Sequence, residues 1–286
     1  MTGVDGTQLI VSPHLDDAAL SAGAWIAELA SAGTEIHVLT LFAGFPTDND
    51  LSPVARDFHD LCGLPHNGTA FEIRRAEDAS ALTILGAHAH HADFHDAIYR
   101  RRPDRAWHCT HGQAMFDTSL PAEPNLRSSL EAAIETRCHR LRPTRILTCA
   151  GIGHHVDHRA TRDATLSVAS RLGIAAETWE DLPYAAEATA ERPDVAGTPI
   201  VRAAAPESWS RKYAAIASYT SQVRMLWPQG QDWVEALNEH ALTHDADGAG
   251  ELYWTVEQEP VRPDTHQPPT QITEPGRVLD DQTVPD

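Results

Sequence analysis

The sequence predicts one α/β domain in which a mostly parallel β-sheet has helices on both faces. Strand-like runs and helical stretches alternate along the chain, which is typical of βαβ units. The chain has 286 residues, of which 42% are hydrophobic, and these can fill a sizeable core. Two clusters of ionisable residues each follow a predicted strand and precede a predicted helix, which is where open α/β sheets bind ligands.

Each element is predicted from its hydrophobic pattern and from the residues that bound it. Short runs rich in β-branched residues and Leu predict strands at residues 7–12, 35–42, 144–150, 176–182 and 251–256. Longer stretches with helical periodicity predict helices at residues 18–33, 74–86, 125–142, 159–173 and 207–226. Gly33 and Gly86 are the expected ends of two helices, and Pro143 separates a helix from the strand after it.

Residues 257–286 differ in composition from the rest of the chain. They contain six prolines, no Phe, Trp or Tyr, and seven acidic residues against two arginines. Such a segment buries too little apolar surface to fold by itself. We therefore expect a single domain over residues 1–256 and an acidic, proline-rich, disordered tail over 257–286.

Composition also bounds the partners and the location. The formal net charge of -19 argues against nucleic acid or an anionic membrane surface as partner, because both bind clustered Lys and Arg. The chain has neither a leader-like start nor an apolar run of about 20 residues, so we expect a soluble cytoplasmic protein. We expect reduced thiols, because no CxxC pair occurs among Cys62, Cys109, Cys138 and Cys149.

The first polar cluster lies in the stretch "LIVSPHLDDAALSAG", residues 9–23. It sets His14, Asp16 and Asp17 between an apolar strand and an apolar helix, where burying unpaired carboxylates would be costly. A divalent metal would neutralise them, since zinc binds imidazole and carboxylate and catalytic sites take three protein ligands. An aspartate pair before a helix is otherwise a common N-terminal cap.

A third ligand has to come from elsewhere in the chain. The loop "GIGHHVDH" at residues 151–158 follows a strand and precedes a helix, as the first cluster does, and contains His154, His155 and His158. The matching topological positions predict that the two clusters meet in space.

The segments "SPHLDD" and "HVDH" resemble the two signatures of the PIG-L or LmbE-like family of zinc-dependent de-N-acetylases, which usually read HPDD and HPDH. Further similarity lies in "RRAEDASALTILGA", "EDLPYA", "KYAAIASYTSQ" and "ELYW", so the resemblance covers residues 8–256. It implies a Rossmann-like fold and one Zn²⁺ per chain. His14, Asp17 and His158 would be the metal ligands, and Asp16 the general base.

The resemblance also implies the remaining site residues. His155 would stabilise the oxyanion or protonate the leaving amine, although His154 leaves the register ambiguous, and Asp157 would orient an imidazole. Substrate contacts are expected from one arginine of the pair at 74 and 75, for which we choose Arg75, and from Asp96 and Tyr184. A second metal in "HAHHADFHD", residues 88–96, is disfavoured because no partner cluster accompanies it.

The function implied is hydrolysis of an N-acetyl group on an amino-sugar-containing small molecule, such as an N-acetylglucosaminyl conjugate in natural-product or thiol-cofactor metabolism. One alternative is an amidase acting on a larger amide, such as a thiol conjugate of glucosaminyl-inositol. The other is a non-catalytic, metal-stabilised sugar-binding protein, suggested by Ala18 where the family commonly has glutamate. The sequence leaves the oligomeric state open, a homo-oligomer included.

Overall fold

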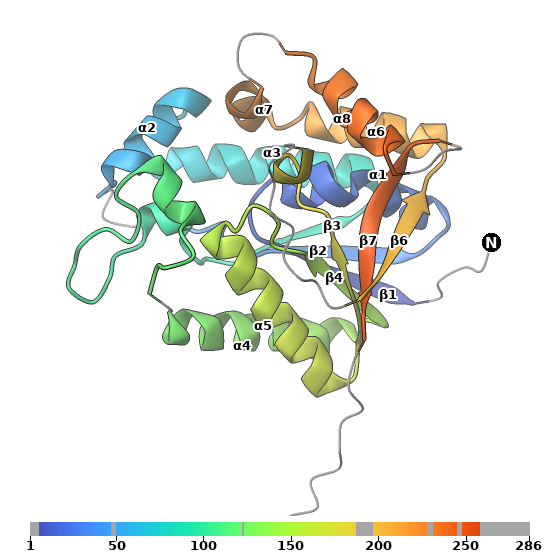
Figure 1. The fold of residues 1–286 in the computed structure, drawn as a ribbon, viewed down its shortest axis with the longest axis horizontal. Coiled ribbons are helices and arrows are strands. Elements are labelled where there is room, and N and C mark those ends of the chain that lie inside the picture. Colours follow the sequence, from blue (N-terminus) through green and yellow to red (C-terminus); the bar gives the residue numbers. More distant parts are fainter. Residues whose placement is uncertain are drawn as a thin grey trace, which may run out of the picture.

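The computed structural model describes residues 6–46, 50–121, 123–186, 197–227, 231–244 and 248–257. Its strands form one sheet in the order β3-β2-β1-β4-β5-β7-β6, parallel except for β7 (Figure 1). The strands are β1 (Thr7–Ser12), β2 (Glu35–Thr40), β3 (His88–His91), β4 (Arg145–Cys149), β5 (Ala175–Trp179), β6 (Thr198–Ala203) and β7 (Gly250–Val256).

Helices cover both faces of this sheet. Helices α1, α3 and α6 pack on one face and helices α4 and α5 on the other (Figure 1). The α-helices are α1 (Asp17–Ser31), α2 (Pro53–Cys62), α3 (Thr69–Leu85), α4 (Pro124–Leu141), α5 (Val156–Leu172), α6 (Pro206–Ile216), α7 (Thr220–Leu226) and α8 (Trp233–Leu242). Short 3-10 helices are η1 (Ala97–Tyr99), η2 (Gly112–Phe116) and η3 (Tyr184–Ala186).

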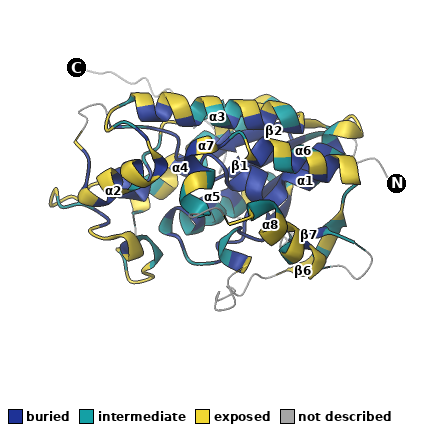
Figure 2. Ribbon diagram, turned by 90° about the horizontal axis from the view of Figure 1, so that it is seen from above, coloured by how far each residue is buried: buried dark blue, intermediate teal, exposed yellow. Residues whose placement is uncertain are grey.

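The core divides into a layer on each face because side chains alternate along the strands. On β1, Ile10 packs with α1, α3 and α6, whereas Leu9 and Val11 pack with α4 and α5. The central strands and α1 are the most deeply buried elements, and the outer helices expose one face to solvent (Figure 2). The predicted α/β fold with a mostly parallel sheet is confirmed.

The prediction of one continuous helix over residues 207–226 is wrong. The chain forms two helices there, α6 and α7, and between them Tyr219 is buried, with its hydroxyl donating to Asp78 Oδ1 at 2.7 Å. Turn-type bonds from Ser218 N and Tyr219 N to the carbonyls three residues before them replace the helical bonds. The tertiary contact of Tyr219 therefore overrides a helical pattern that is continuous in sequence.

Four elements were not predicted: α2, β3, β6 and α8. Strand β3 reads His-Ala-His-His and lies at the sheet edge, so it lacks the apolar pattern of a strand. The predicted tail beyond Glu257 lies outside the described residues. All four cysteines are free and buried.

The strand order positions the two predicted clusters side by side. Strands β1 and β4 are parallel neighbours, with Val11 opposite Thr148, while β2 and β5 continue the sheet outward on either side. The order reverses between β1 and β4, and the carboxyl ends of the strands at such a switch point are where open α/β sheets bind ligands. No helix in the described part of the chain has the length and apolarity needed to cross a membrane.

Candidate metal centre and active site

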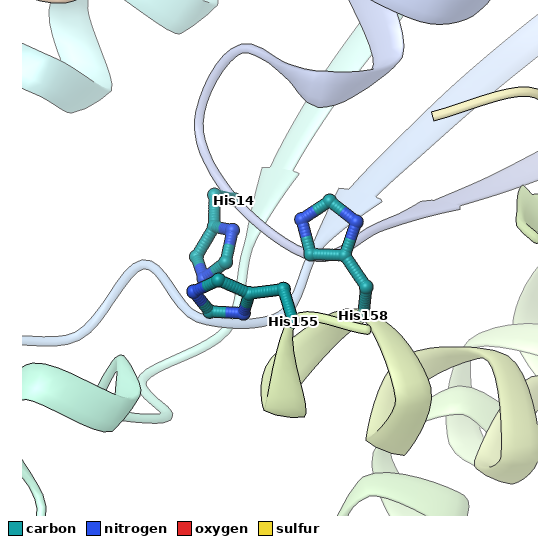
Figure 3. Close-up of side chains that lie close together, drawn as sticks. All are labelled: His14, His155 and His158. Carbon is teal, nitrogen blue, oxygen red and sulfur yellow. The ribbon is translucent and has the colours of Figure 1, made fainter. Parts of the chain in front are cut away.

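Two strand ends and two helix starts build the site. His14 follows β1, Asp16 occupies the position before α1 and Asp17 is the first residue of that helix, while His155 caps α5 and His158 lies in its first turn. Figure 3 shows the rings of His14, His155 and His158 converging from these two segments. One ring nitrogen of each lies within 4.8 Å of the others. The spatial meeting predicted from the sequence therefore occurs.

The Asp17 carboxylate lies between two imidazoles. Its Oδ2 atom is 3.3 Å from His14 Nδ1 and 3.3 Å from His158 Nε2. The far nitrogen of each ring contacts another buried carboxylate: His14 Nε2 is 3.1 Å from Asp157 Oδ2, and His158 Nδ1 is 2.7 Å from Asp181 Oδ1. When those nitrogens donate protons to the carboxylates, the lone pairs of the near nitrogens face Asp17.

The two distances from Asp17 suit a divalent cation, and His155 joins His14 and His158 in a group whose ring nitrogens could hold one. Two ligand atoms bound to one tetrahedral zinc at about 2.0–2.2 Å lie about 3.3–3.6 Å apart, which matches both distances from Asp17. His158 Nε2 is buried and makes no hydrogen bond within the described part of the chain. A carboxylate behind each imidazole is the arrangement that fixes the tautomer of metal-binding histidines. The three predicted ligands thus form a candidate metal centre.

Burial and mutual charge shift the pKa values of these groups strongly. Burial alone would lower the pKa of His158, but the carboxylates of Asp17 and Asp181 have the larger combined effect and raise this pKa to about 9. Burial raises the pKa of Asp17, but His158 and His14 outweigh it and hold that pKa well below its usual range. In the metal-free site, protons on the histidines balance the carboxylates, and a cation would replace those protons.

Asp16 is the neighbour of Asp17 in the chain but takes no part in the contacts among His14, Asp17 and His158. It is buried at the start of α1 with φ 156° and ψ -33°, a backbone conformation that side-chain-bearing residues rarely adopt, and such outliers cluster at functional sites. Its side chain does not cap the helix. Burial, followed by the charge of Asp17, raises the pKa of Asp16 to about 7.

His155 and Asp157 are both buried beside His14. The Nδ1 atom of His155 accepts a hydrogen bond from the backbone N–H of Asp157 at 3.2 Å, so a neutral ring has its proton on Nε2. Burial lowers the pKa of His155 well below its usual value, which keeps the ring neutral. Asp157 accepts from Arg100 at 2.6 Å and from Ala97 N at 2.9 Å, so its carboxylate is fixed where it contacts His14.

The predicted substrate contacts divide into two groups. Asp96 lies 3.5 Å from His14 Nε2, and the ring of Tyr184 packs 5.5 Å from the ring of His158. Arg75 instead donates to the carbonyl of Ala43 and to Asp93, and in the described structure none of its bonds joins it to the metal-ligand cluster.

Arg74, the neighbour of Arg75, is the buried arginine of the pair. Burial lowers the pKa of Arg74, but the charges of Asp16, Tyr99 and Asp96 raise it above its usual value. A helical position alone could not decide which of two adjacent arginines points inward.

The other histidines near the motifs have different surroundings. His154 is half-exposed in a left-handed conformation with φ 63°, while His155 is buried. In the tract 88–96, His91 bonds Asp78 at 2.7 Å and His90 bonds His37 at 2.9 Å. No group of potential metal ligands among the described residues includes a histidine of that tract.

Two further site residues, Asp181 and Arg100, were not assigned a role from the sequence. Asp181 lies just after β5, where its Oδ2 also accepts from Ile152 N at 3.0 Å. The segment "EDLPYA", which contains Asp181, resembles the family sequence, but the resemblance gave Asp181 no role. Arg100 bonds both Asp157 and Glu123 and lies in an irregular segment with no motif. Asp181 and Arg100 each support the site through a hydrogen bond to a residue that is distant in sequence.

The fold and the site together define an α/β protein with a buried His–Asp–His candidate cation site at the switch point of its sheet. The chain belongs to the PIG-L family, described as GlcNAc-PI de-N-acetylase, whose profile matches residues 9–169. Its similarity to a zinc-inhibited form of teicoplanin deacetylase covers 90% of this chain and 100% of that one, at 34% identity and a TM-score of 0.80.

Two more relatives are similar to the chain. A40926 pseudoaglycone deacetylase is 36% identical, with a TM-score of 0.75, over 89% of this chain and 98% of that one. The 2'-N-acetylparomamine deacetylase of Niallia circulans is 27% identical over 186 residues, which span 62% of this chain and 66% of that relative's length.

Proposed function

We propose that this chain is a zinc-dependent N-deacetylase that removes an acetyl group from an amino-sugar-containing small molecule. One observation carries the proposal. A single carboxylate oxygen of Asp17 lies 3.3 Å from a ring nitrogen of both His14 and His158, and each ring is held from behind by a buried carboxylate. Family membership and the deacetylase relatives support the same chemistry.

His14, Asp17 and His158 would hold the ion. Imidazole nitrogen and carboxylate oxygen suit zinc, and three protein ligands are typical of a catalytic zinc site. A zinc-inhibited form of a similar protein makes zinc the first metal to test. Bound zinc supplies a Lewis acid that lowers the pKa of water toward about 7 and polarises an amide carbonyl.

Asp16 and His155 would perform the proton transfers and charge stabilisation. Asp16, next to a ligand but free of its contacts, takes a proton from the attacking water as a new C–O bond forms at the acetyl carbon. His155 donates a hydrogen bond from Nε2 to the oxyanion. The C–N bond then breaks, the amine leaves with the proton taken by Asp16, and the products are acetate and a free amine.

The substrate would be recognised by polar groups around this centre. Asp96 and Arg74 offer an acceptor and a donor for sugar hydroxyls, and Tyr184 offers a ring against which a sugar can stack. The relatives act on N-acetylparomamine, teicoplanin and A40926 pseudoaglycone by name. N-acetylated compounds of these kinds, together with N-acetylglucosaminyl conjugates, are therefore the first substrates to test.

The test measures metal content and product together. We expect purified protein, prepared without chelators, to contain zinc and to release acetate from an acetamido-sugar compound. Release of a larger acid would favour the amidase alternative. Bound zinc with no turnover on a broad acetamide panel would favour the sugar-binding alternative, and protein without any divalent metal would refute the proposal. The cytoplasmic location, the domain boundary at 256 and the absence of nucleic-acid or membrane partners stay predictions.

A further inference from the structure

A second group of metal-binding side chains lies at the junction of β5 and α8. Glu180 directly follows β5, His240 lies in the last turn of α8, and His244 lies in the turn just after the helix ends at Leu242. Glu180 Oε2 is 2.8 Å from His240 Nε2 and 2.7 Å from His244 Nε2, and the two nitrogens are 3.2 Å apart. Imidazole nitrogen and carboxylate oxygen are ligands that zinc binds in proteins.

The three atoms lie close together, somewhat nearer to one another than the distance of about 3.3–3.6 Å that separates two ligands of a tetrahedral zinc. The three atoms form a triangle with sides of 2.8, 2.7 and 3.2 Å. A point above the plane of this triangle lies about 2.1 Å from all three atoms, which is the usual bond length of zinc to nitrogen and oxygen. Small rotations that move the three side chains apart would let one ion contact Glu180, His240 and His244 at once.

The surroundings suit a small cation and exclude a substrate. These three residues line a cavity of about 10 Å³, which is the space of one water-sized sphere. The same cavity is lined by Glu251 and Lys212, which pair at 2.7 Å. With Glu180 included, two carboxylates face one ammonium group.

We propose that Glu180, His240 and His244 form a second divalent-cation site, of the zinc class, that fastens α8 to the carboxyl end of β5. The cavity is too small for any organic substrate, so the site is structural. It also adjoins the candidate metal centre in sequence, because Asp181, the partner of His158, follows Glu180 directly. The proposal adds a second ion to the one per chain expected from the family.

Counting bound zinc tests the proposal. After saturation with zinc and removal of excess, we expect two ions per chain in the wild type, one in His240→Gln/His244→Gln, and two in the control His139→Gln. His139 is an exposed histidine that pairs with Glu135 one turn away on α4, so the control removes a similar pair without a cavity. The same number of ions in the wild type and in the double variant would overturn the proposal.

A second measurement does not require the histidine variants to be stable. Asp17→Asn removes a ligand of the candidate catalytic centre but leaves the α8 site intact. Zinc should still bind this variant at one ion per chain and slow amide hydrogen exchange in α8 at least tenfold, with no such change in α4. Unchanged exchange in α8 would refute the second site. Loss of acetate release in the same variant concerns only the proposed function, so the two proposals can fail separately.

Discussion

Asp181 fixes the ring of His158 from behind, so Asp181→Asn should weaken zinc binding at the candidate metal centre. The carboxylate accepts two hydrogen bonds, from His158 Nδ1 at 2.7 Å and from Ile152 N at 3.0 Å. An asparagine side chain offers one carbonyl oxygen, so its NH₂ group must face one of these two donors.

The structure sets the size of this effect. Losing the carboxylate partner of a metal-binding histidine typically costs 10- to 100-fold in metal affinity, or about 1.4–2.8 kcal/mol. The unsatisfied buried donor costs the metal-free protein about 1–3 kcal/mol of stability. That is less than the stability of about 5–15 kcal/mol of a typical domain, so the variant should fold.

Competition titration with a chromophoric chelator measures the zinc affinity. The background His240→Gln/His244→Gln confines the titration to the catalytic centre. The control is Asp163→Asn, which removes an exposed aspartate of α5 that pairs with Arg162 and should leave zinc affinity unchanged. A folded Asp181→Asn protein with zinc affinity within threefold of its parent would refute the assignment of His158 as a ligand fixed by Asp181.

Three further predictions concern catalysis, packing and pH. Asp16→Asn should keep its zinc by elemental analysis and lose about 10²- to 10⁴-fold in kcat, because a general base contributes that much. Lys212→Met leaves Glu251 buried without its 2.7 Å partner and should cost about 3–5 kcal/mol in urea unfolding, whereas Arg171→Met, at an exposed pair, should cost under about 1 kcal/mol. In metal-free protein, Glu180 has its pKa lowered from 4.5 to about 2, so the stability that it contributes is present above its unfolded value and is lost as pH falls through that value toward 2. The advantage of wild type over Glu180→Gln in chemical unfolding should accordingly shrink below pH 5.

Each of these predictions has a clear contrary result. If Asp16→Asn lost both its zinc and its activity, Asp16 would be a metal ligand. If the variant kept full activity, Asp16 would have no part in the mechanism. Equal costs for Lys212→Met and Arg171→Met would mean that burial does not strengthen the inner pair. A stability difference between wild type and Glu180→Gln that stays constant from pH 7 to pH 3 would contradict an ionised, histidine-bonded carboxylate.

The sequence by itself determined the α/β architecture and the place where chemistry would occur. Hydrophobic periodicity reports burial, so the five predicted strands were found. A polar cluster between a strand and a helix has one location in a parallel sheet, at the carboxyl edge. The meeting of His14 and His158 across about 140 residues followed from this local logic, because β1 and β4 are neighbours in the sheet.

Only the tertiary structure decided which side chains support the site. Asp181 and Arg100 act on His158 and Asp157 through contacts that no local pattern encodes, and the packing of α3 buries Arg74 rather than Arg75. Likewise, Glu180 and His240 are 60 residues apart and meet because α8 folds over the end of β5. Periodicity records whether a side chain is buried, but the identity of its partner depends on the packing of distant elements.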